Sequence, residues 1–148
     1  MMAKPIQPLI LFAMRMIVGG VFLIAGALKL KDPEAFSISI QAYRLVPFGV
    51  AAALATYLPW VELVVGGALL AGWRMAGAAA SVALMSIVFM GAIGSAWARG
   101  LDIACGCLGD AGGGAVSYPW HILGNLCLLA MALILVCRGG RRIDSGAR

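Results

Sequence analysis

The sequence predicts an all-α integral membrane protein, in which four transmembrane helices form a bundle and a short interfacial helix lies between the first and second spans. Hydrophobic residues make up 63% of the 148 residues and charged residues only 11%, whereas a soluble domain has about 25% charged residues. A helical span needs about 20 apolar residues, and four such stretches with short connections nearly fill the chain. The length fits one domain over residues 1–148.

The four apolar stretches are expected to cross the membrane over about residues 9–28, 50–72, 75–98 and 119–137, and a basic tail follows over 138–148. The first stretch is expected to be an uncleaved anchor. Its apolar run is too long for the core of a signal peptide, and Arg15 interrupts it.

Lysine and arginine are distributed unequally between the two sides of this bundle. The side of both termini has seven of the 11, namely Lys4, Arg15, Arg74, Arg138, Arg141, Arg142 and Arg148. The other side has Lys29, Lys31, Arg44 and Arg99, with four of the six acidic residues, Asp32, Glu34, Asp102 and Asp110. By the positive-inside rule, both termini face the cytoplasm and the loops after the first and third spans face outward. No basic cluster lies on a soluble surface, which argues against nucleic-acid binding.

The loop after the first span has the signature of a helix start. In residues 32–34, Asp is a good N-cap, Pro suits the first helical position and Glu adds an acid to the first turn. Phe36, Ile40 and Tyr43 then recur at helical spacing until Pro47. This pattern predicts a short interfacial helix beside the mouth of the bundle, either as an ordered connector or as a lid that binds a partner.

The first three spans are rich in small residues, which let membrane helices approach closely. They are Gly19, Gly20, Gly26, Gly66, Gly67, Gly72, Gly77, Ala80, Ser81, Gly91, Gly94 and Ser95. This composition predicts a tightly packed bundle.

Cys105 and Cys107, separated by Gly106, are the residues that point most directly to chemistry. The glycine gives the backbone freedom to bring the sulfurs together, and a strained, exposed disulfide is the kind that exchanges. The pair is therefore a candidate catalytic redox pair, with metal ligation, a structural bridge or inert thiols as alternatives. Cys127 and Cys137 lie about 15 Å apart along one helix, cannot pair with each other and are expected to behave as small hydrophobes.

Glu62 is a charged residue near the middle of the second span. Such a charge costs roughly 3 kcal/mol to insert, and it usually faces inward and pairs. Arg15 is the predicted partner, which would make a buried charge pair that fixes the geometry of the bundle. The alternatives are a proton path or an acid at a quinone site. Pro59 is expected to kink the span and to shape a pocket for Glu62.

His121 is the sole histidine, near the outer end of the fourth span. As a cation it could modulate the pKa of the thiols, and as neutral imidazole it could join Cys105 and Cys107 in a metal site. A wetted polar residue at the membrane interface is the third interpretation.

Three stretches together resemble the MauE family of methylamine-utilisation membrane proteins, within the broader DoxX-like group. They are RMIVGGVFLIAGALKL over 15–30 with the following Asp-Pro, LPWVEL over 58–63, and RGL over 99–101 leading into CGCLG over 105–109. The resemblance covers about residues 9–137.

The resemblance implies a multi-pass protein of the bacterial cytoplasmic membrane that supports maturation of the methylamine dehydrogenase beta subunit or another disulfide-rich client. The family's cysteine pair would be Cys105 and Cys107, in a periplasmic loop, with a periplasmic thioredoxin-like protein as partner. Similarity to other four-helix membrane thiol oxidoreductases suggests a quinone as electron acceptor, by analogy alone. Two other functions stay open: a non-catalytic assembly or transport factor, and a metal-handling membrane protein that uses Cys105, Cys107 and His121.

Overall fold

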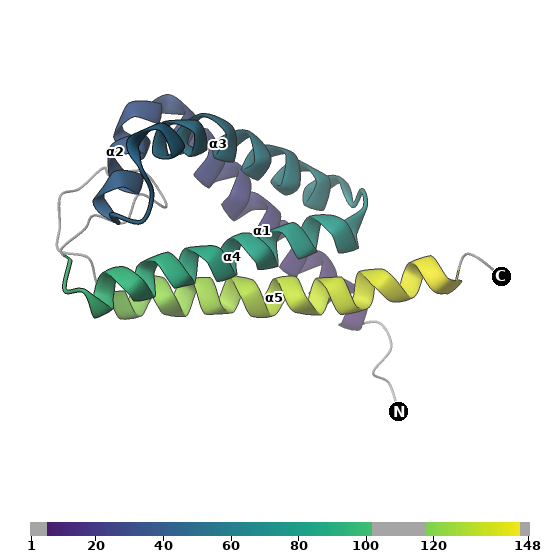
Figure 1. The fold of residues 1–148 in the computed structure, drawn as a ribbon. Coiled ribbons are helices and arrows are strands. Elements are labelled where there is room, and N and C mark those ends of the chain that lie inside the picture. Colours follow the sequence, from purple (N-terminus) through teal and green to yellow (C-terminus); the bar gives the residue numbers. More distant parts are fainter. Residues whose placement is uncertain (1–5, 102–117, 146–148) are drawn as a thin grey trace.

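The computed structural model describes residues 6–101 and 118–145, which form five helices (Figure 1). They are α1 (Ile6–Lys31), α2 (Pro33–Ala42), α3 (Phe48–Ala71), α4 (Met75–Ala98) and α5 (Tyr118–Ser145). Within this part of the chain, four helices are long and apolar enough to cross a membrane, over Pro8–Lys31, Phe48–Ala71, Met75–Ala98 and Pro119–Arg138. These segments confirm the predicted all-α fold and its four spans, and the protein is a multi-pass membrane protein.

Helix α2 begins as its sequence predicts. The side chain of Asp32 accepts a hydrogen bond from the backbone N–H of Ala35 at 2.9 Å, and proline occupies the first turn. An N-cap of this kind satisfies one of the backbone donors that a helix start leaves open. The helix ends at Ala42, and Arg44 then takes a positive φ of 51° that turns the chain toward α3.

The four long helices pack as two pairs, α1 with α3 and α4 with α5. The connection between α3 and α4 lies at one end of the bundle, the end at which α1 begins and α5 ends, and α2 lies at the other (Figure 1). From the α3–α4 connection the two pairs diverge toward α2. We call the end at which α2 lies the α2 end.

Glycines set the close approach of α1 and α3. A Cβ atom on Gly66 would lie 2.9 Å from the carbonyl oxygen of Gly19, and one on Gly26 would lie 2.9 Å from the carbonyl oxygen of Pro59. Backbone cannot move aside cheaply, so these positions require glycine. The predicted role of small residues is therefore confirmed for this pair. It does not extend to Gly20, Gly67, Gly77, Gly91 and Gly94, where an added Cβ would meet nothing within 4 Å.

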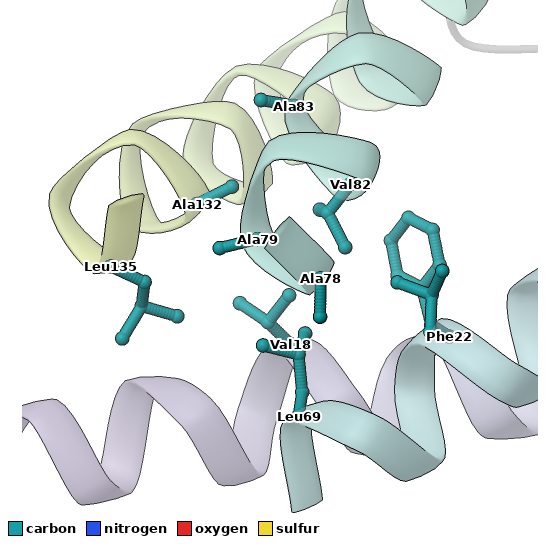
Figure 2. Close-up of a cluster of buried hydrophobic side chains, with 10 residues drawn as sticks. Val18, Phe22, Leu69, Ala78, Ala79, Val82, Ala83, Ala132 and Leu135 are labelled. Carbon is teal, nitrogen blue, oxygen red and sulfur yellow. The ribbon is translucent and has the colours of Figure 1, made fainter. Parts of the chain in front are cut away.

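The main hydrophobic core joins the two helix pairs on the side of the α3–α4 connection (Figure 2). Its buried residues come from all four long helices: Val18, Phe22, Val65, Leu69, Ala78, Ala79, Val82, Ala83, Ala132 and Leu135. Alanines on α4 let this helix lie close to the others, while larger side chains on α1 and α3 fill the space.

A second, smaller cluster lies at the α2 end. Tyr43, Ile93 and Ala96 are buried there, and Leu101 and Ile122 pack against them. The cluster joins the last residues of α2 and α4 to the first turns of α5. The large apolar residues left exposed, such as Leu84 and Val88 on α4, suit contact with lipid.

Candidate functional site

A buried ion pair joins α1 to α3. The ammonium of Lys29 donates to Oε1 of Glu62 at 2.5 Å, and the two residues are only 5% and 6% exposed. Charged residues are almost never this buried unless they are paired. The structure thus confirms that Glu62 faces inward and pairs with a cation.

The predicted identity of that cation was wrong, because Glu62 pairs with Lys29 and not with Arg15. Gly26 of α1 packs against Glu62, whereas the guanidinium of Arg15 lies beside Gly72. Ten residues of helix separate Glu62 from Gly72, which is about 15 Å. The antiparallel register therefore puts Arg15 out of reach, while Lys29 lies one turn beyond Gly26.

Arg15 has other neighbours at the opposite end of the bundle. Its guanidinium lies 5.2 Å from the ring centroid of Phe12 and its Nη1 lies 4.0 Å from the sulfur of Met75. Next to it, Gly72 caps the C-terminal end of α3 with a φ of 73°, which glycine adopts readily. Arg15 thus packs where α3 gives way to α4.

The sequence did contain a signal for Lys29. Val18, Phe22, Ala25 and Lys29 follow one another at intervals of four, three and four residues, and all four are buried. This spacing puts them on one face of α1. The predicted end of the first span, at about residue 28, had placed Lys29 in the loop.

Helix α2 covers the ion pair. The ammonium of Lys29 lies 5.0 Å from the ring centroid of Phe36, which is itself buried. A cation over an aromatic face is stabilised by about 2 kcal/mol when both groups are desolvated. Phe36 therefore both shields the pair from water and ties α2 to α1.

The other end of α2 is tied to α4. Nη2 of Arg99 donates to the carbonyl oxygen of Tyr43 at 2.5 Å, and its Nε donates to the carbonyl oxygen of Ser95 at 3.0 Å. Phe36 and Tyr43 are seven residues apart, about 10 Å along the helix, and both face inward. Helix α2 thus bridges the buried ion pair and the point at which α4 ends.

Cys105 and Cys107 lie outside the described residues, in the segment 102–117. The residues on both sides of that segment are described. Leu101 lies directly before it, and Ile122 lies one turn into α5, the helix that follows it. Both residues pack against the cluster around Tyr43. The described flanks of the segment therefore both lie at the α2 end. His121 lies half-buried in the first turn of α5, next to Ile122.

The remaining cysteines are free and lie on the exposed surface of α5. Cys127 and Cys137 do not pair with each other, as predicted. They lie outside the core, where they would contact lipid. Among the described residues, no three His, Cys, Asp or Glu side chains are grouped so that they could hold a metal ion. The metal site predicted from Cys105, Cys107 and His121 has only its histidine within this range.

Comparison with known proteins gives a consistent result. The family model described as methylamine utilisation protein MauE matches residues 7–138. A methylamine utilization protein MauE from Paracoccus denitrificans is 32% identical over 131 residues, which cover 88% of this chain and 70% of that protein. No solved structure matches the chain.

Proposed function

The chain belongs to the MauE family, and we propose that it supports disulfide formation or thiol exchange in proteins outside the cytoplasmic membrane. Cys105 and Cys107 are the redox pair of this proposal. One observation carries it: Leu101 and Ile122, which flank the cysteine segment, both pack against the cluster of Tyr43, Ile93 and Ala96 at the α2 end. A thiol segment whose two described flanks lie at the same end of the bundle is suited to exchange with a client.

The chemistry needs no further reactant for the exchange itself. A thiolate attacks one sulfur of a disulfide, a mixed disulfide forms, and a second thiol resolves it. One disulfide breaks as another forms, and the two electrons and two protons move between the protein pairs. Gly106 between the cysteines favours a small, strained ring, and strained disulfides have the more oxidising potentials.

The orientation of the bundle is part of the proposal. The described cations at the α2 end include Lys29, Lys31, Arg44 and Arg99. These are four of the 11 lysines and arginines, and the other seven are Lys4, Arg15, Arg74, Arg138, Arg141, Arg142 and Arg148. The positive-inside rule then favours placing the α2 end, with the cysteines, in the periplasm of a bacterial cell, where disulfides persist.

The family suggests a client. The relative from Paracoccus denitrificans is named for methylamine utilization, and we assign this chain to the maturation of the disulfide-rich methylamine dehydrogenase beta subunit. A periplasmic thioredoxin-like protein is the proposed exchange partner.

Mixed-disulfide trapping tests the proposal. Cys105→Ser and Cys107→Ser variants each leave one thiol, which attacks an oxidised partner but has no neighbour to resolve the product. We expect at least one of them to accumulate a partner adduct that disappears on reduction. The matched control is Cys127→Ser, which keeps the pair intact and should trap nothing.

Absence of any adduct from both variants, with client maturation unchanged in the double serine variant, would leave a non-catalytic assembly or transport factor. A metal-handling protein would instead bind copper or zinc stoichiometrically and lose it on His121→Ala.

A further inference from the structure

Three buried polar side-chain atoms have no hydrogen-bond partner among the described residues. They are Nε of Arg15, Oε2 of Glu62 and Oγ of Ser86. The carboxylate of Glu62 already pairs with Lys29 through its other oxygen, and the hydroxyl of Ser86 is uncharged. Arg15 differs from both, because its guanidinium is charged and forms no ion pair with any described residue. A buried polar atom without a partner calls for an explanation.

The described contacts of the Arg15 side chain are all with uncharged groups. Its Nη1 lies 4.0 Å from the sulfur of Met75, a weak acceptor, and this is its single hydrogen bond within the described chain. Its Cζ lies 5.2 Å from the centroid of the Phe12 ring. A Cβ atom on Gly72 would lie 2.6 Å from Nη1, so the guanidinium occupies the space that a side chain at residue 72 would need. Packing thus holds the guanidinium in place, while most of its N–H donors lack an acceptor.

The guanidinium of Arg15 lies near one surface of the membrane. Along α1, Arg15 is about 10 Å from the start of the span Pro8–Lys31, and its side chain reaches the α3–α4 connection at Gly72. The next residue of that connection, Trp73, is 67% exposed. Exposed tryptophans at the ends of spans mark the boundary between hydrocarbon and lipid head groups. The guanidinium therefore lies at about the depth of the head groups.

The described charge around this connection is positive. Arg74 lies in the α3–α4 connection itself and is exposed. The C-terminal end of α3 favours a cation at this place, yet no described carbonyl or carboxylate accepts a hydrogen bond from Arg15. The acidic side chains that the structure describes lie away from this connection, toward α2: Asp32, Glu34 and Glu62. The acceptor that fits the free donors of Arg15 is therefore an anion from outside the described chain.

From this geometry we propose that Arg15 binds the phosphate of an anionic phospholipid in the leaflet on the side of the α3–α4 connection. A guanidinium presents parallel N–H donors that match two phosphate oxygens, and such charge-assisted bonds are the strong ones in proteins. Arg74 adds a preference for a head group with a net negative charge, because basic residues at the ends of spans attract anionic lipids. The site is separate from the proposed thiol exchange, since the flanks of the cysteine segment lie at the other end of the bundle.

Native mass spectrometry of the purified full-length protein in detergent tests this site. The probes are dioleoyl phosphatidylglycerol, dioleoyl phosphatidylcholine and inorganic phosphate. We expect one tightly bound phosphatidylglycerol per chain, and binding of phosphatidylcholine that is weaker by about tenfold. Equal binding of the two lipids would overturn the proposal. Displacement of phosphatidylglycerol by millimolar inorganic phosphate would identify a soluble anion as the ligand and would overturn the assignment to a lipid.

Substitutions of Arg15 locate the site. Arg15→Gln removes the charge and should weaken phosphatidylglycerol binding about tenfold. Arg15→Lys keeps the charge but not the paired donors, and it should weaken binding severalfold. Circular dichroism shows whether each variant keeps its helices, and Arg15→Lys decides if Arg15→Gln does not fold. Unchanged binding in a folded Arg15 variant overturns the proposal.

Two exposed arginines at opposite ends of the bundle supply a matched pair of variants. Arg74 and Arg44 both have a left-handed backbone, with φ of 45° and 51°, so glutamine at either position changes the charge and leaves the backbone requirement the same. Arg74→Gln should weaken phosphatidylglycerol binding about fivefold, and Arg44→Gln should leave it unchanged. Equal weakening by the two substitutions would show attraction to net charge without a site, and would overturn the proposal.

Discussion

The Lys29–Glu62 pair should dominate the response of this bundle to loss of a single charge. Lys29→Met removes the ammonium, fits the same volume and leaves Glu62 buried on α3 without its cation. At the 2.5 Å separation, the attraction lost is about 7 kcal/mol with an effective dielectric constant of about 20. The ammonium no longer has to be desolvated, which offsets part of this loss. The net cost should be about 3–5 kcal/mol, the range for breaking a buried pair.

The double variant Lys29→Met with Glu62→Met distinguishes the contribution of the ion pair to stability from that of side-chain packing. It leaves no buried charge, so its unfolding free energy should return close to that of the wild type or exceed it. Lys31→Met is the matched control. Lys31 lies in the same turn of α1 but is exposed, and its substitution should change the unfolding free energy by no more than about 0.5 kcal/mol.

The assay is reversible unfolding of the purified protein in mixed micelles of increasing SDS content, followed by circular dichroism. Two results would refute the reasoning. One is a Lys29→Met cost as small as that of Lys31→Met. The other is a double variant no more stable than Lys29→Met.

Three further predictions use the same unfolding assay or hydrogen exchange. Gly66→Ala should destabilise the protein by about 1–3 kcal/mol, because its Cβ would meet the backbone of α1. Gly67→Ala, whose Cβ would meet open space, should stabilise the protein by up to about 1 kcal/mol. Equal effects of the two substitutions would contradict the packing of α1 on α3. Ser86→Ala should raise the unfolding free energy by about 1–3 kcal/mol, because the buried hydroxyl of Ser86 on α4 has no hydrogen-bond partner among the described residues. Ser81→Ala should be near neutral, since Ser81 is only partly buried and donates to the carbonyl oxygen of Gly77. A loss of stability in Ser86→Ala would show a satisfied hydroxyl. Arg99→Ala should speed amide exchange in the last turn of α2, by the equivalent of about 1 kcal/mol for the loss of a partly buried charge-assisted hydrogen bond. Unchanged protection would show that this bond does not hold α2.

Hydropathy and helix signals were sufficient to predict the fold. The four spans follow from apolar length, and the start of α2 follows from Asp32 followed by Pro33, because capping is a local property of the chain. Composition alone could not predict which glycines lie at the contact between α1 and α3. Gly66 and Gly67 are adjacent and chemically identical, and only the rotation of α3 decides that Gly66 meets α1.

The candidate site was predicted in part. A carboxylate in the middle of a span had to face inward, and it does. Its partner depends on the register of α1 against α3, which is fixed by side-chain packing between segments far apart in the sequence. Ser86 gave no signal in the sequence, since serine is common in membrane helices. That its buried hydroxyl has no partner in the described part of the chain is visible only in three dimensions.

The central claim is that Cys105 and Cys107 cycle between a disulfide and two thiols on the outer face of the membrane. The most direct measurement is labelling of intact cells with a membrane-impermeant maleimide, in a Cys127→Ala and Cys137→Ala background that leaves only this pair. We predict little labelling before reductant and two labels per chain after it. Two unchanged free thiols in both conditions, or labelling only in inverted vesicles, would contradict the claim.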